Sequence, residues 1–159
     1  HFRPGLDEQI AHLSEALGVM NAQEANTILR RYIAKDGRLG HDSRGAAIWA
    51  LGLLHADSPD EALAELLAGR LTDFDILNPE MPIVIEMSAV ALARMKSRSQ
   101  LSALRTRMDA SFGRTLLAAR WSIEHITGES LPPLKPEILN RMNWFMEPAR
   151  GVPSSTEAP

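Results

Sequence analysis

The chain has 159 residues, 45% of them hydrophobic, with 17 Lys and Arg residues against 20 Asp and Glu residues and a net charge of −3. This length and composition fit one globular domain and exclude a disordered chain, a collagen-like chain and a membrane-spanning helix. The absence of cysteine excludes disulfides and thiolate chemistry, and the slightly negative charge argues against obligatory binding to bulk nucleic acid.

Apolar residues recur at helical spacing through most of the chain, which predicts an all-α protein. The first helical stripe consists of Ile10, Leu13, Leu17 and Met20. A second helix is expected behind Asn21, whose side chain would form a capping box with Glu24. A third stripe surrounds Leu51, and a fourth helix is expected to begin with Ser58 as its N-cap and Pro59 as its first residue.

The helical pattern fails between Gly69 and Pro82, where turn-forming residues predict an extended loop. Helicity is expected to resume from Pro82 to Lys96, because the apolar spacing continues smoothly into an alanine-rich segment. The β-branched run at 83–85 leaves a short strand as the local alternative.

The C-terminal part contains three further predicted elements. Ser99 is expected to cap a sixth helix, and a seventh helix is expected to end at Gly128. A shorter last helix is predicted over 136–146. The predicted organisation is one helical repeat domain over 1–147, followed by a mobile tail over 148–159 that is rich in Pro and Ser.

A five-residue pattern recurs along the chain, with copies that begin at Ala16, Ala50, Ala91 and, in a degenerate form, Ser122. Each of the first three copies is followed by a second helix with a leucine, at Leu29, Leu63 and Leu104. A small third residue, such as Gly18, would let one helix approach the next closely. Repeated helix pairs are typical of an α-solenoid, because one pair is too small to bury its apolar faces alone. We therefore predict an α-solenoid of about four helix pairs, with a compact non-repeating helical bundle as the alternative.

Three segments carry a resemblance to a known family, namely Arg44–Gly52, Met87–Arg94 and Ala118–Gly128. With them, residues 6–133 resemble the HEAT-repeat family, and in particular the short bacterial repeats related to those of bilin lyases. The resemblance implies a helical repeat scaffold. The long connection over 69–82 and the weak fourth copy depart from the family pattern. Some HEAT-like enzymes hold iron with His–Glu dipeptides, and because this sequence has none, that activity is not carried over.

No group of residues has the spacing of a catalytic or metal-binding motif. The five histidines are scattered singly, and the serines near helix starts are explained by capping. Asp73 and Asp75 in the loop could form a paired acid site or bind a hard cation, although a solvated loop is the preferred interpretation. We therefore expect no enzymatic activity, no cofactor and no metal.

Positive charge gathers in the segment 94–120, whose only acidic residue is Asp109. The candidate partner-binding residues are Arg94, Arg98, Arg105, Arg107 and, as an aromatic anchor, Trp144. The first three arginines are spaced close to one helical stripe, which would form a basic strip for an acidic protein or a phosphate backbone. Because the sequence shows no catalytic constellation and no interleaved exposed aromatic residues, an acidic protein surface is favoured as partner over nucleic acid. An ordinary solvated flank is the alternative for the arginines, and a helix that caps the last repeat is the alternative for Trp144.

These features predict a non-enzymatic HEAT-like scaffold or adaptor that binds a protein partner through its helical surface. The alternative function is a nucleic-acid-binding HEAT-like module that uses the basic segment 94–120. A tetrapyrrole lyase or chaperone-like module rests on the family likeness alone. The chain begins at His1 without an apolar signal segment, so we expect a processed chain or a piece of a longer one. The sequence leaves the compartment open, with the cytoplasm slightly favoured over the periplasm.

Overall fold

The computed structural model describes residues 4–133 of the chain. Its helices are α1 (Pro4–Val19), η1 (Gln23–Ala25), α2 (Asn26–Leu29), η2 (Arg30–Tyr32), α3 (His41–Leu54), α4 (Glu61–Leu71), α5 (Pro82–Arg94), η3 (Arg98–Gln100), α6 (Leu101–Asp109) and α7 (Gly113–Thr127), where η marks a 3₁₀ turn. All regular elements of the described range are helical, which confirms the all-α prediction there.

One sequence alternative is excluded by the helices, and three C-terminal predictions lie beyond residue 133. The strand alternative at 83–85 is wrong, because these residues lie in the first turn of α5. The predicted last helix over 136–146, the mobile tail over 148–159 and Trp144 lie outside the described residues. Among the helices of 4–133, none is long and apolar enough to cross a membrane.

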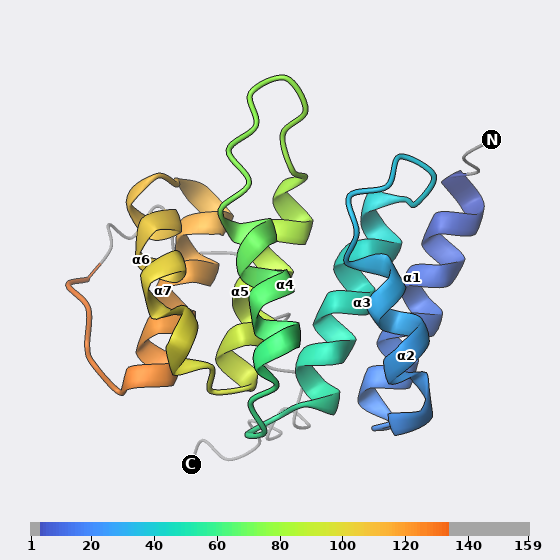
Figure 1. Ribbon diagram of the computed structural model, residues 1–159, viewed down its shortest axis with the longest axis horizontal. Helices are drawn as coiled ribbons and strands as arrows, with labels where there is room; N and C mark the ends of the chain where they lie inside the picture. The colour runs from blue at the N-terminus through green and yellow to red at the C-terminus, as the bar shows by residue number, and fades with distance from the viewer. Residues whose placement is uncertain (1–3, 134–159) are drawn as a thin grey trace, which may run out of the picture.

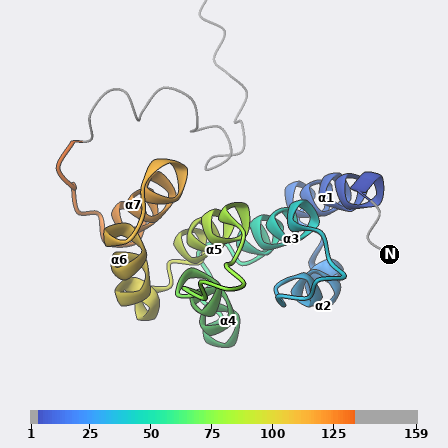
Figure 2. The same ribbon diagram turned by 90° about the horizontal axis from the view of Figure 1, so that it is seen from above.

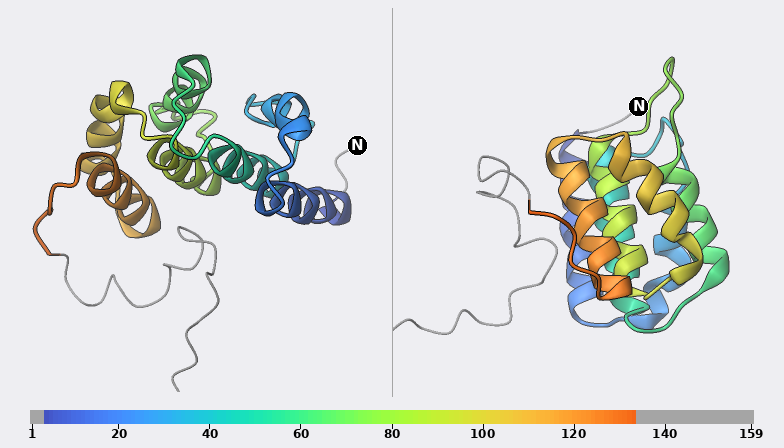
Figure 3. Two further views of the ribbon diagram at one scale, coloured as in Figure 1. Left: turned by 90° about the horizontal axis from the view of Figure 1, so that it is seen from below. Right: turned by 90° about the vertical axis from the view of Figure 1, so that its left-hand side faces the viewer.

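The helices lie in two rows (Figure 2). We call α1, α3, α5 and α7 the inner row, in which each helix packs on the next, so that α1 and α7 stand at opposite ends (Figure 1). We call α2, α4 and α6 the outer row, whose members pack on α3, α5 and α7 respectively. The free face of the inner row is gently concave (Figure 3). This packing is compatible with both expected architectures, the α-solenoid and the helical bundle.

The five-residue pattern lies where inner helices touch. A Cβ atom added to Gly18 would stand 2.8 Å from the Cα of Ala50, and one added to Gly52 would stand 2.7 Å from the Cα of Ala91. The glycine of one copy thus faces the first alanine of the next, which confirms the expected close approach. In the fourth copy Ser122 replaces this alanine, and its hydroxyl donates to a backbone oxygen of α5 at 2.8 Å.

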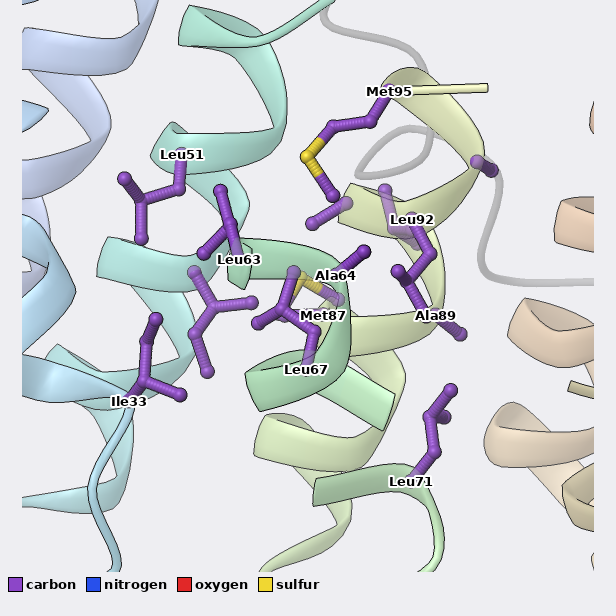
Figure 4. Packing of buried hydrophobic residues seen from close by; sticks show 14 of the residues in the cluster. Ile33, Leu51, Leu63, Ala64, Leu67, Leu71, Met87, Ala89, Leu92 and Met95 are labelled. Atoms are coloured by element: carbon purple, nitrogen blue, oxygen red, sulfur yellow. The ribbon is translucent and has the colours of Figure 1, made fainter. Parts of the chain in front are cut away.

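The leucines that follow the repeated pattern form the layer between the rows. Leu29, Leu63 and Leu104 are all buried, one on each outer helix. Figure 4 shows the leucines of α4 among side chains of α3 and α5, including Leu51 and Leu92. The leucine that follows each copy of the pattern therefore occupies an equivalent buried position in its helix pair.

Three helix starts differ from the sequence expectations, and one helix end agrees. Asn21 does not cap a helix, because it takes a left-handed conformation with φ of 54° before the chain enters η1. Asp60, and not Ser58, caps α4, since its carboxylate accepts a hydrogen bond from the third backbone N–H of the helix at 2.9 Å. Ser99 lies within η3 and not at its cap. Gly128 ends α7 with φ of 76°, as predicted.

Candidate protein-binding surfaces

Two of the four predicted partner-binding arginines point into the fold. The guanidinium of Arg94 lies 4.7 Å from the ring centroid of Trp49 and donates to the Trp49 backbone oxygen at 3.1 Å. Burial lowers the pKa of Arg94 to about 10. Arg107 donates to the backbone oxygens of Leu71 and Asp73 beneath the loop between α4 and α5. An exposed strip that includes both residues is therefore a wrong expectation, because internal contacts occupy their guanidinium groups.

The other cations of the basic segment lie at or near the surface. Arg98 on η3 and Arg105 on α6 are exposed. Internal ion pairs join Arg105 to Glu129 at 2.9 Å, Arg114 to Glu86 at 3.2 Å and Arg120 to Glu124 at 3.2 Å. Two of these pairs join separate parts of the fold, α7 to α5 and α6 to the residues after α7, whereas the third lies within α7. Each of these three arginines thus has a carboxylate beside it, which reduces the net positive charge that an acidic protein or a phosphate backbone would meet.

The free face of the inner row contains a groove of about 400 Å³, which we call the inner-row groove. Its apolar floor is made by Ala11, Ala46, Trp49, Ile83 and Met87. Carboxylates line its edge on α1 and α3, at Glu8, Glu15 and Asp42. His12 and Arg114 also line the groove, and Arg114 is paired with Glu86. The groove therefore combines an apolar floor with a negatively charged border.

Small residues keep the floor of this groove low. On α3, Asp42, Gly45, Ala46 and Trp49 recur at helical spacing and so share one face. A Cβ atom added to Gly45 would stand 2.9 Å from a side-chain carbon of Ile83, so this glycine lets α5 approach α3. The groove was not predicted from the sequence because its lining residues come from helices that lie far apart in the chain. The signal available was this second, weaker stripe along α3.

The loop over 72–81 is anchored to the fold by ion pairs. Arg44 forms a bidentate pair with Glu80, with N–O distances of 2.8 and 2.7 Å, and both side chains are almost fully buried. Arg70 reaches the same carboxylate at 3.2 Å, and Lys35 donates to Asp73 at 2.7 Å. The loop therefore sits on a buried polar network that joins it to α3, α4 and the segment after η2.

The two loop aspartates do not face one another as a paired acid site. Asp73 pairs with Lys35, whereas Asp75 accepts hydrogen bonds from the backbone N–H groups of Leu77 and Asn78 in its own turn. Within residues 4–133, no group of three His, Asp or Glu residues could hold a metal ion. These carboxylates thus shape the loop.

Burial and local partners shift the pKa values of three carboxylates, Asp73, Glu80 and Glu86. The hydrogen bond from Lys35 holds the pKa of Asp73 below its ordinary value. Burial acts to raise the pKa of Glu80, whereas the hydrogen bonds from Arg44 and from the backbone N–H of Met81 act to lower it. The hydrogen bonds outweigh burial, so the pKa of Glu80 lies below its ordinary value. For Glu86 on α5, burial outweighs the charge of Arg114, and the pKa is raised.

We expect Glu86→Gln to raise the melting temperature at pH 7 by roughly 2–4 °C, which is about 1 kcal/mol for a domain of this size. Because the pKa of Glu86 is raised in the folded chain, stability is lost as the pH rises from the pKa of the unfolded chain through the higher pKa of the folded chain. The advantage of the amide should therefore vanish near pH 3, where the carboxyl is protonated in both states. Calorimetry at both pH values tests this, and a variant less stable than the wild type at pH 7 would contradict it.

In comparisons with known proteins, no family model, no curated protein and no solved structure matches the chain. Function is therefore inferred from the residues and their geometry. The features that bear on binding are the inner-row groove and the exposed apolar side chains on the rest of the surface.

Proposed function

We propose that the chain is a non-enzymatic, HEAT-like α-solenoid scaffold that binds a protein segment along the inner-row groove. The observation that carries this proposal is the apolar floor with its carboxylate border, built from several helices of one row. Amphipathic helices bind in grooves of this kind, with their apolar side chains on the floor. The repeated contacts of Gly18 with Ala50 and of Gly52 with Ala91 support the solenoid.

The charge of the groove favours a basic partner segment. Glu8, Glu15 and Asp42 stand along one border, so lysines or arginines beside the apolar face of a bound helix would meet opposite charge. The acidic partner expected from the sequence loses support because Arg94 and Arg107 are buried. A carboxylate border also disfavours a phosphate backbone, so a protein partner is preferred over nucleic acid.

Two synthetic probes test the proposal directly. One is a fluorescein-labelled helical peptide of leucine and lysine with an apolar face, and the other has glutamate in place of lysine. We expect the lysine peptide to bind with a clear rise in anisotropy and the glutamate peptide to bind at least about tenfold more weakly. The double variant Glu8→Lys/Glu15→Lys should weaken binding of the lysine peptide by about tenfold or more.

A matched control carries the same change of charge on the other side of the molecule. Glu65→Lys/Asp109→Lys changes two exposed carboxylates of the outer row and should bind the lysine peptide as the wild type does. Equal loss of binding in both double variants would show a general charge effect and contradict the proposed site. Failure of the wild type to bind either peptide would contradict it as well.

A further inference from the structure

The side of α1 turned away from the inner-row groove carries large apolar side chains that no described outer helix covers. They are Leu6, Ile10, Leu13 and Leu17, together with Met20 directly after the helix, and we call these five residues the α1 stripe. Leu17 is partly buried against the core, Ile10 is half-buried, and the other three are exposed. The nearest outer helix, α2, has only one α-helical turn between two 3₁₀ turns, and it packs on α3. As a result Leu13 is 65% exposed and Met20 is 67% exposed.

The positions equivalent to Leu13 and Met20 on the other inner helices are buried. When the repeated patterns are aligned, Leu13 corresponds to Ala47, Ser88 and Ala119, all 0% exposed. Met20 corresponds in the same way to Leu54, Met95 and Ile126, at most 7% exposed. An outer helix packs on each of α3, α5 and α7, whereas within 4–133 no outer helix packs comparably on α1. The α1 stripe is therefore a core position of the repeat that lacks its cover.

The opposite end of the inner row is closed. Glu124 occupies the third position of the repeated pattern, where Gly18 and Gly52 admit the next helix. Its carboxylate pairs with Arg120 and accepts a hydrogen bond from the backbone N–H of Leu131 at 3.1 Å. The third copy has the small residue Ala93 at this position, so α7 differs from the other inner helices in presenting a large charged side chain there, which disfavours head-to-tail stacking of copies.

We propose that the α1 stripe is a self-association surface, through which two copies pack their α1 helices antiparallel about a two-fold axis. Its members alternate at steps of four and three residues, which is the spacing of helices that interdigitate along a seam. The flanking residues Gln9 and Ala16 are uncharged, and Glu8 and Glu15 lie across the helix at the groove. Two copies thus meet without repulsion between like charges. Because each copy uses its own stripe in the same two-fold contact, association stops at a dimer.

The dimer would place two inner-row grooves on one particle, since the groove and the α1 stripe lie on different sides of α1. Such an arrangement binds a bivalent partner more tightly than one groove does. The self-association itself does not depend on the groove, and it is measured without any groove ligand. Its failure and the failure of the proposed function are therefore distinguishable.

Sedimentation equilibrium of the full chain measures the association. We expect a dimer at about 200 µM that dissociates on dilution, and a monomer for Leu13→Glu/Met20→Glu, with the dissociation constant raised about 100-fold or more. Both side chains are exposed, so the helical content and melting temperature of this variant should stay those of the isolated subunit. The control Leu66→Glu changes a leucine of the outer row that is 52% exposed, and it should remain dimeric.

A crosslink tests the two-fold geometry. The chain has no cysteine, so Leu13→Cys introduces a single thiol near the expected axis and should form a disulfide-linked dimer on mild oxidation. Leu66→Cys should not. A wild-type monomer at about 200 µM, or a dimer that survives Leu13→Glu/Met20→Glu, would overturn the proposal. If Phe145→Glu abolished the dimer and Leu13→Glu/Met20→Glu did not, the contact would belong to the C-terminal residues, and this result would overturn the proposal as well.

Discussion

Gly52→Ala is expected to lower the free energy of unfolding by about 2 kcal/mol, although alanine favours an isolated helix by about 1 kcal/mol over glycine. The added Cβ would stand 2.7 Å from the Cα of Ala91. A backbone atom cannot yield as a flexible side chain does, so α3 and α5 would have to separate. Urea denaturation followed by circular dichroism measures the change.

The same substitution at Gly69 provides the control. This glycine lies in α4 with nothing within 4 Å of its added Cβ, so Gly69→Ala should raise the free energy of unfolding by about 0.5–1 kcal/mol. Opposite signs for the two alanine variants are the expected result. If Gly52→Ala stabilised the chain as Gly69→Ala does, the close contact between α3 and α5 would be wrong.

Arg44→Met is expected to lower the free energy of unfolding by about 3–5 kcal/mol, the largest effect of any single change that we predict. The variant leaves the buried carboxylate of Glu80 without its bidentate partner, and Arg70 at 3.2 Å compensates only in part. Arg44→Met/Glu80→Leu should recover most of the loss, because it removes the stranded charge together with its partner. Thermal and urea unfolding of the three proteins would test this, and equal losses in the single and double variants would contradict it.

The contribution of Glu80 also has an expected pH dependence. Its pKa is lowered in the folded chain, so the stability it provides is complete above the unfolded pKa and is lost as the pH falls through the folded value. The advantage of the wild type over Arg44→Met should therefore shrink under acid conditions. An advantage that stays constant below pH 4 would show that the ion pair is not its source.

The elements best predicted from the sequence were those set by local spacing. The helix from Pro82, the loop after Gly69 and the end of α7 at Gly128 follow from apolar periodicity, turn-forming residues and the tolerance of glycine for positive φ. The small residues of the repeated pattern were also assigned correctly to helix contacts. In each case the neighbouring residues in the sequence carry the physical cause.

The features that sequence reasoning missed depend on residues far apart in the chain. Arg94 and Arg107 share the spacing of surface arginines, and only the positions of Trp49 and Leu71 reveal that both point inward. The α1 stripe is exposed because α2 packs on α3, and the spacing of residues along α1 does not indicate where α2 packs. The groove likewise depends on the side-by-side packing of the inner helices, which residue spacing within one helix does not specify.

The arrangement of the inner helices in an open row, with α1 and α7 three helix spacings apart, underlies every proposal above. Val19→Cys and His125→Cys occupy equivalent positions of the first and last copies of the repeated pattern, and the chain has no other cysteine. Pulsed electron resonance between nitroxide labels at these sites should give a distance of roughly 24–30 Å, lengthened slightly by the label arms. A dominant distance of roughly 15 Å or less, as in a bundle that brings both helices to one core, would contradict the row.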